Sequence, residues 1–295
     1  MSSVSLDTLN SADCATFIAA IDEVMELAPW VAEEAFAKRP FANLAALYAT
    51  MTDAVRNAGD ERQRALINGH PDLAGKAARE GKLTADSTAE QAAAGLDRLT
   101  EEEFAAFHRL NDAYRTKFGM PFIVCVRRHG KESILREFER RLKNDPASER
   151  QTALAEIFRI AALRLDQRVT ASDRLKVHGH LSTHVLDTHS GRPAEGIEVE
   201  LIELANLGAS RVIARAITNA DGRTDQPLVH GRPVPIGRYE LTFNVGKYFS
   251  ERQVPMWDPP FLDLIPLRFS VSRPEGHLHV PLLVTPWSYA TYRGS

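Results

Sequence analysis

Three short segments in the second half of this 295-residue chain concentrate side chains that could do chemistry. They supply His184, Arg223 and the closely spaced pair His277 and His279. Residues two apart in an extended strand share a face, so the two histidines of the pair point the same way. Imidazoles can move protons near neutral pH, and an arginine can hold a planar anion or stabilise an oxyanion. The pattern is therefore compatible with acid–base catalysis on a small anionic substrate.

Two other interpretations fit the same residues. A His-x-His pair with His184 as a third ligand is typical of a zinc site. Surface histidines without a special role are common, and Arg223 follows an Asp-Gly turn signal, where exposed side chains are usual. Spacing alone leaves a proton-transfer site, a metal site and an ordinary surface open.

The first half of the chain offers weaker signals. His70 precedes a proline in a loop-like segment. Ser87 and Glu90 have the spacing of a capping box at a helix start, and Arg164 fits the solvated face of a helix. Taken one by one, these residues favour structural roles.

Composition limits the class of protein. The chain is 44% hydrophobic and 25% charged, as expected of a globular protein long enough for two domains. The net charge of −3 favours neither nucleic acid nor an anionic membrane as a partner, and no run of about 18 apolar residues exists. Two cysteines, Cys14 and Cys125, are too few for a disulfide scaffold, so we expect a reducing, cytoplasmic location.

The elements that must position these residues differ between the two halves. Only 5 of the 16 prolines precede residue 171. In residues 1–165, apolar side chains recur at helical spacing, and Thr100 with Glu103 forms a capping box. Gly119 ends that helix and Pro146 starts the last one. Residues 1–165 are therefore predicted to form an all-α domain.

Residues 179–295 read as β-structure. Apolar and polar residues alternate with period two around Val199, Leu241 and Leu267, and Gly-containing turn signals separate these runs. This pattern predicts an antiparallel β-sandwich. The polar segment 166–178 has no clear period and is predicted to be a linker.

Residues 179–295 resemble 5-hydroxyisourate hydrolase, the enzyme branch of the transthyretin-like family. The resemblance rests on the three segments above and on the closing Tyr-Arg-Gly-Ser of residues 292–295. It implies metal-free hydrolysis of a ring amide in 5-hydroxyisourate, with His184 or His279 activating water and Arg223 holding the substrate. The remaining positions that it implies are a catalytic Ser295 and, in supporting and substrate-binding roles, His277 and Tyr292.

The first half resembles the decarboxylase that acts on 2-oxo-4-hydroxy-4-carboxy-5-ureidoimidazoline (OHCU). The matching segments are 69–75, 87–96, 118–123 and 156–165. The resemblance implies that His70 is the acid–base residue and that Glu90 orients its ring. The substrate-binding positions that it implies are Pro71, Ser87, Gln91, Ile123 and Arg164.

Together the two resemblances imply a bifunctional, cofactor-free enzyme that converts 5-hydroxyisourate to OHCU and then to S-allantoin. They also imply a homo-oligomer, with a dimeric first domain and a tetrameric second domain whose cleft lies at a subunit interface. Two alternatives remain: a metal-dependent cyclic amidohydrolase, and a non-enzymatic transthyretin-like ligand-binding protein.

Overall fold

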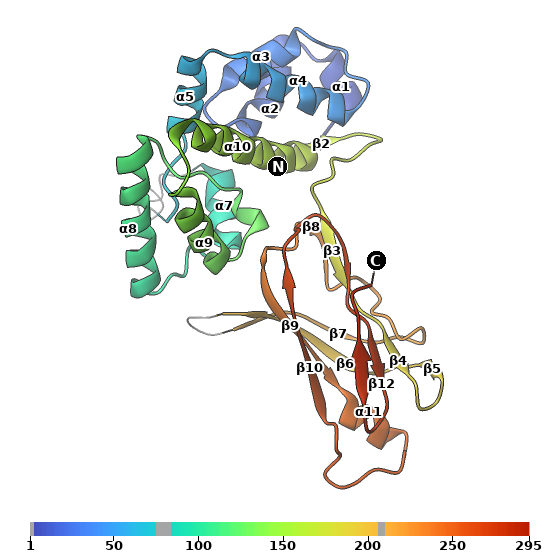
Figure 1. Cartoon of the computed structure of the whole chain (residues 1–295). Helices are drawn as coiled ribbons and strands as arrows, with labels where there is room; N and C mark the ends of the chain where they lie inside the picture. Colours follow the sequence, from blue (N-terminus) through green and yellow to red (C-terminus); the bar gives the residue numbers. More distant parts are fainter. Residues whose placement is uncertain (1–2, 75–83, 206–209, 295) are drawn as a thin grey trace. The chain divides into compact units, whose positions relative to one another are not determined.

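The computed structural model describes residues 3–74, 84–205 and 210–294 (Figure 1). The chain divides into two compact units. The first contains residues 1–127 and 133–177, and the second contains residues 128–132 and 178–295. Each unit is described by itself below.

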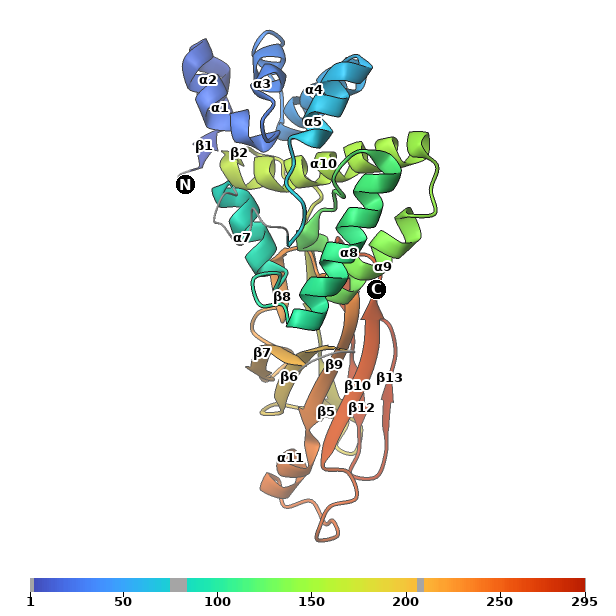
Figure 2. The same cartoon turned by 90° about the vertical axis from the view of Figure 1, so that its left-hand side faces the viewer.

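The first unit is helical, as predicted. Its described elements are β1 (Val4–Ser5), α1 (Leu6–Ser11), α2 (Cys14–Ile21), the 3₁₀ turn η1 (Asp22–Val24), α3 (Pro29–Phe36), α4 (Leu44–Asn57), α5 (Asp60–Asn68), α7 (Ala85–Ala93), α8 (Glu101–Phe118), η2 (Val126–Arg128), α9 (Lys131–Arg141), α10 (Pro146–Arg168) and β2 (Val169–Thr170). Helix α10, 23 residues long, runs through the middle of the helices, with α2 to α5 on one side and α7 to α9 on the other (Figures 1 and 2).

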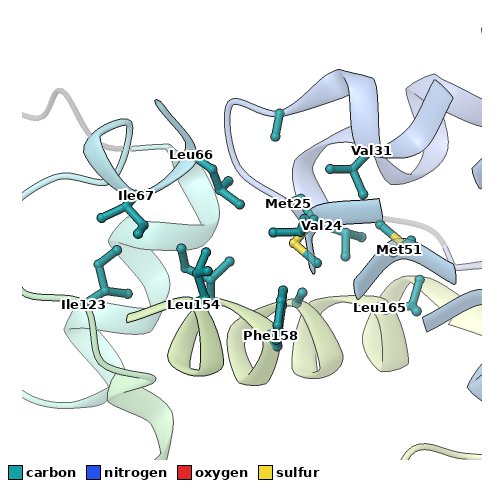
Figure 3. Packing of buried hydrophobic residues seen from close by; sticks show 14 of the residues in the cluster. Val24, Met25, Val31, Met51, Leu66, Ile67, Ile123, Leu154, Phe158 and Leu165 are labelled. Carbon is teal, nitrogen blue, oxygen red and sulfur yellow. The ribbon is translucent and has the colours of Figure 1, made fainter. Parts of the chain in front are cut away.

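The core of this unit gathers around α10. Leu154, Phe158 and Leu165 lie along the helix and are buried. They face residues such as Met25, which follows η1, and Met51 of α4 (Figure 3). Because α10 is buried over much of its length, polar side chains that it carries inward must find partners inside the protein.

Helix ends agree with the sequence in three places and differ in two. Thr100 and Glu103 form the predicted capping box, and Gly119 ends α8 in the left-handed region with φ of 67°. Pro146 starts α10. The predicted cap at Ser87 is wrong, because Thr84 caps α7 and accepts a hydrogen bond from the Ser87 backbone N–H.

Helix α10 also ends later than predicted. It continues to Arg168, within the segment expected to be a linker. The buried carboxylate of Asp166 binds Arg174 and accepts from the backbone N–H of Leu175 at 2.9 Å. This loop-closing carboxylate keeps the start of the expected linker folded against the first unit.

The second unit is a β-structure, also as predicted. Its elements are β3 (Gly179–Ser182), β4 (Val185–Asp187), β5 (Arg192–Pro193), β6 (Glu198–Leu204), β7 (Arg211–Ile217), β8 (Val229–Arg232), β9 (Gly237–Asn244), α11 (Val245–Glu251), β10 (Leu264–Val271), β11 (Gly276–His279), β12 (Leu282–Val284) and β13 (Tyr289–Thr291). One sheet has the antiparallel order β10-β9-β6-β7, with Val199, Leu241 and Leu267 buried on it. The other layer contains β11-β3-β8 and β13-β12-β4-β5.

The second layer also contains two parallel strand pairs, a detail that the alternating pattern did not predict. Strand β11 runs parallel to β3, and β12 runs parallel to β4. The register places His277 opposite His180 and His279 opposite Ser182. Strands almost a hundred residues apart in sequence therefore bring their polar side chains to one face.

None of the described helices has the length and apolar character that crossing a bilayer requires.

Two candidate active sites

All seven residues predicted for the first site line one cavity of the helical unit. They come from the end of α5, from α7, from α10 and from the apolar run before η2, and are His70, Pro71, Ser87, Glu90, Gln91, Ile123 and Arg164. Glu26 also lines the cavity, and apolar side chains such as Phe122 and Ile160 form the rest of its wall. The cavity is thus a mostly apolar space with a few polar groups that converge on it.

A backbone carbonyl fixes the ring of His70. Its Nδ1 lies 2.9 Å from the carbonyl oxygen of Leu66. A carbonyl oxygen can only accept, so Nδ1 carries the proton and the neutral ring presents Nε2 as a lone pair. Burial lowers the pKa of His70, and this outweighs the opposite effects of the Leu66 carbonyl and the Glu26 carboxylate. His70 is therefore neutral at pH 7 and able to accept a proton at Nε2.

Glu90 does not orient His70 in this structure. Its two oxygens accept from Nε and Nη2 of Arg164, at 3.0 and 2.9 Å. The ring is held by Leu66 instead, so the predicted His70–Glu90 contact is corrected to a Glu90–Arg164 pair. The charge of Glu90 still acts on His70 through space and raises its pKa.

Sequence analysis missed Glu26. Its carboxylate accepts from Thr84 Oγ1 at 2.7 Å and Ser87 Oγ at 2.9 Å, and Arg164 Nη2 lies 3.2 Å away. Burial opposes ionisation, but these hydrogen bonds and the Arg164 charge lower the pKa of Glu26 overall. The sequence marks Glu26 only as a carboxylate within an apolar run. Because Ser87 lies 61 residues later, local spacing could not predict their contact.

Arg164 therefore sits between two carboxylates. Its side chain is 3% exposed, and each of its three nitrogens donates to protein acceptors, including the backbone carbonyl of Glu23. Those contacts occupy the guanidinium fork, so Arg164 positions Glu26 and Glu90 at the cavity rather than reaching an anion with a free edge.

The remaining predicted residues shape the wall. Gln91 accepts from the backbone N–H of Ala74 at 3.2 Å, which ties α7 to the segment that follows His70. The carbonyl of Ile123 accepts from Arg141 at 2.6 Å, which fixes this part of the apolar run.

The second site is a chain of hydrogen bonds among three histidines and one serine. Nδ1 of His184 lies 2.7 Å from Nε2 of His279. Nδ1 of His279 lies 2.8 Å from Ser182 Oγ, and Ser182 Oγ lies 2.7 Å from Nε2 of His277. Both nitrogens of His279 are therefore engaged, while the described residues offer no hydrogen bond to Nε2 of His184. Ser182 was not among the predicted site residues.

Arg223 approaches this chain through the backbone. A tight turn centred on Gly222, with φ of 69°, lets Arg223 pair with His184 in an isolated antiparallel bridge. The Arg223 side chain is exposed. Its positive charge lowers the pKa of His184, His277 and His279 alike. The structure thus brings together the arginine and the histidines that the sequence predicted.

The histidines are held neutral. Burial, with the neighbouring His184 and Arg223, lowers the pKa of His279 to about 4. Burial lowers the pKa of His184 and His277 as well. At pH 7 the chain of rings can accept a proton but does not carry one in excess.

The carboxy-terminal tail lies next to these histidines. The Gly294 backbone N–H donates to the His279 carbonyl at 2.9 Å. Tyr292, 56% exposed, lines a second cavity together with His277. Ser295 lies outside the described residues.

The arrangement also bears on the zinc interpretation. Within residues 3–74, 84–205 and 210–294, no three His, Cys, Asp or Glu side chains form a group with metal-binding geometry. His184 and His279 direct ring nitrogens at each other, as hydrogen-bond partners do rather than ligands of one ion.

Comparisons with known proteins match the two units separately. The model of the OHCU decarboxylase family matches residues 10–166, and that of the HIUase/Transthyretin family matches residues 181–294. The 5-hydroxyisourate hydrolase of Deinococcus radiodurans is 52% identical over 119 residues, which cover 40% of this chain and 98% of that protein. The 2-oxo-4-hydroxy-4-carboxy-5-ureidoimidazoline decarboxylase of Halalkalicoccus jeotgali is 38% identical over 173 residues, which cover 59% of this chain and 96% of that protein.

One solved structure matches almost the whole chain. The crystal structure of (S)-allantoin synthase is 34% identical, and the match covers 99% of this chain and 100% of that one, with a TM-score of 0.51.

Proposed function

The chain belongs to the OHCU decarboxylase family through residues 10–166 and to the HIUase/Transthyretin family through residues 181–294, and from that premise we propose how its two units act. It is a bifunctional enzyme of urate degradation that hydrolyses 5-hydroxyisourate to OHCU and decarboxylates OHCU to (S)-allantoin. The observation that carries this conclusion is the presence of both families in one chain that matches (S)-allantoin synthase end to end.

In the decarboxylase unit, we assign the proton transfer to Nε2 of His70. When carbon dioxide leaves OHCU, the conjugated ring accepts the electron pair. Nε2 takes the proton of the substrate hydroxyl as the carbon that lost the carboxylate becomes a carbonyl, and returns it to the ureido-bearing ring carbon on the same side. A proton from solvent neutralises the ring nitrogen that received the electron pair. The Nδ1 contact with Leu66 supports this assignment, because it leaves Nε2 unprotonated. Delivery from one face yields one enantiomer.

In the same unit, Ser87, Glu90, Gln91 and Arg164 shape the substrate pocket. Pro71 and Ile123 form its wall. Glu26 and Glu90, held by Arg164, present the acceptors that the N–H groups of a ureido substituent require.

In the hydrolase unit, we assign water activation to Nε2 of His184. His279 uses both of its nitrogens within the protein, so it stabilises His184 rather than touching water itself. Arg223 binds the substrate and offsets the negative charge on the carbonyl oxygen. His277 and Tyr292 complete the binding surface, and Ser295 remains a proposed catalytic residue.

One experiment tests both assignments. The full chain is supplied with urate and urate oxidase, each intermediate is followed by absorbance, and allantoin is followed by circular dichroism. His70→Ala should block only the later step, and His279→Ala should block only the earlier step. For His279→Ala, the later step is measured after a separate 5-hydroxyisourate hydrolase has been added to supply OHCU. Loss of both steps in either variant under these conditions, or of neither, would contradict the assignment of separate sites.

Two rival functions predict other results. A metal-dependent amidohydrolase would stop opening the ring when a chelator is added, whereas we expect the rate to be unchanged. A non-enzymatic binding protein would bind 5-hydroxyisourate without accelerating its loss.

We further propose that residues 1–165 and 179–295 are the two functional domains, joined through residues 166–178. We also propose a homo-oligomer, dimeric through the first domain and tetrameric through the second. Cys14 and Cys125 are not joined by a disulfide, which supports work in the reducing cytoplasm.

A further inference from the structure

Ser182 occupies the middle of the histidine chain, between two rings that do not otherwise bond to each other. We propose that Ser182 is a positioning residue that joins His277 to His279 and His184 in one proton relay. This inference rests on the proposed hydrolase function of the second unit.

The parallel register of β3 and β11 builds this connection. His279 lies opposite Ser182, and His277 lies opposite His180. The two pairs are two residues apart along the strands, so all four side chains lie on the same face. The serine hydroxyl lies 2.8 Å from Nδ1 of His279 and 2.7 Å from Nε2 of His277. A hydroxyl has one proton to donate, so it donates to one ring and accepts from the other.

That single proton couples the tautomers of all three rings. If Ser182 donates to His277, then Nδ1 of His279 must donate to the serine, and Nε2 of His279 must accept from Nδ1 of His184. Nε2 of His184 is then unprotonated and ready to act as a base. If Ser182 donates to His279 instead, every hydrogen bond reverses, and Nε2 of His184 carries a proton. The relay thus has two possible directions of hydrogen bonding. Water is activated only in the one in which Ser182 donates to His277.

The proton transfer balances along this path. A water proton moves to Nε2 of His184 as the water oxygen bonds to the ring carbonyl of 5-hydroxyisourate. The Nδ1 proton of His184 moves to His279, the Nδ1 proton of His279 moves to Ser182, and the hydroxyl proton moves to His277. The carbon–nitrogen bond then breaks, and the reverse transfer delivers one proton to the leaving nitrogen. No co-reactant other than water is needed.

The surroundings of His277 suit the outer end of such a relay. His277 is exposed, whereas His279 is 7% exposed. The ring of His180 stacks on His277 at 4.2 Å between centroids. Burial and the charges of His180 and Arg223 lower the pKa of His277, so His277 holds the extra proton only transiently and returns it readily. Glu275, Arg293 and Tyr292 line the same cavity as His277. A proton that reaches His277 is therefore within reach of solvent.

The test compares Ser182→Ala with Ser182→Thr in the full chain. Ser250→Ala is the matched control, because Ser250 is an exposed serine of the same unit, in α11. We expect Ser182→Ala to lower kcat for 5-hydroxyisourate about 10- to 100-fold, at or below the lower end of the contribution of about 100- to 10,000-fold that general acid–base catalysis makes, because His184 itself is kept. Threonine keeps the hydroxyl and should retain the rate within about threefold, as should the control. Decarboxylation by each variant reports that the chain is folded.

A second pair of variants separates a relay from a merely structural role. His277→Gln should lower kcat for hydrolysis in the wild-type background but have no further effect on kcat in Ser182→Ala, because the link is already broken; any loss of substrate binding by His277 appears in KM in both backgrounds. Equal effects of His277→Gln in both backgrounds would overturn the proposal, as would a fully active Ser182→Ala or a failure of threonine to rescue.

Nitrogen-15 NMR of the histidines tests the link without turnover. The hydrogen-bonded Nδ1 shift of His279 should be present in the wild type and in Ser182→Thr and be lost in Ser182→Ala. An unchanged shift in Ser182→Ala refutes the relay. A wild-type chain that shows the shift but does not hydrolyse 5-hydroxyisourate would instead refute the proposed function.

Discussion

Replacing Glu90 tests whether this carboxylate works through Arg164, as the structure indicates, or directly on His70. Arg164 donates two hydrogen bonds to Glu90, at 3.0 and 2.9 Å, and its own side chain is 3% exposed. Hydrogen bonds to charged groups contribute about 1.5–3 kcal/mol each. Glutamine keeps one acceptor oxygen, so we expect Glu90→Gln to lower the unfolding free energy of the first unit by about 2 kcal/mol.

Removing the cation should cost more. Arg164→Met leaves Glu26 and Glu90 buried beside each other without a counter-charge, and breaking a buried pair in this way costs about 3–5 kcal/mol. Much of the penalty arises because the two carboxylates repel. In the Arg164→Met background, Glu90→Gln removes that repulsion, so its cost should vanish or become a gain. The double-mutant cycle of Glu90→Gln and Arg164→Met should therefore give an interaction free energy of about 2 kcal/mol or more.

The measurement must report on one unit of a two-unit chain, for which global unfolding is not a single transition. Hydrogen exchange of peptides from α7 and α10 in the full chain gives the local unfolding free energy. Glu61→Gln, an exposed change in α5, is the control and should shift it by less than about 0.5 kcal/mol. A coupling below about 0.5 kcal/mol would refute the pairing. So would a Glu90→Gln variant that changes the His70 tautomer while leaving protection of α10 intact.

Three further predictions concern stability and pH. The pKa of His279 is lowered from 6.5 to about 4, so the unfolded chain protonates this ring more readily than the folded chain does. The second unit should therefore lose stability as pH falls from about 6.5 to 4. Urea melts at several pH values should show that His279→Gln flattens this dependence. Arg141 and Glu149 form a fully buried ion pair. Glu149→Gln breaks this pair and should lower the local unfolding free energy by about 3–5 kcal/mol, measured by hydrogen exchange in α9 and α10. Gly222→Ala would push a Cβ against the Val185 carbonyl and strain a positive φ, so it should lower hydrolysis while sparing decarboxylation.

The sequence predicts local features of this protein well, for a physical reason. The capping box at Thr100, the left-handed Gly119 and the alternation around Leu241 depend on residues within a few positions of one another. Period two also places His277 and His279 on one face. All of these are short-range consequences of backbone geometry.

Contacts between distant segments could not be predicted in this way. Ser182 meets His277 only because β3 pairs in parallel with β11, 95 residues later in the chain. Glu26 meets Ser87 and Arg164 across 61 and 138 residues. A register or a helix packing decides each of these contacts, and neither leaves a signal in the local spacing. Resemblance named residues that line one cavity, but it paired Glu90 with His70, whereas the structure pairs Glu90 with Arg164.

Neither site pairs its histidines with a carboxylate through a hydrogen bond among the described residues. A carboxylate bonded directly to an imidazole raises its pKa and favours the charged ring, which is a proton donor. Here the carbonyl of Leu66 holds His70, and Ser182 with His184 holds His279. Arg164 and Arg223 lie near enough to lower the pKa of the histidines in their own units. Two unrelated folds thus both hold a neutral imidazole at the site, and in the proposed mechanism that imidazole takes a proton from the substrate or from water before it gives one back.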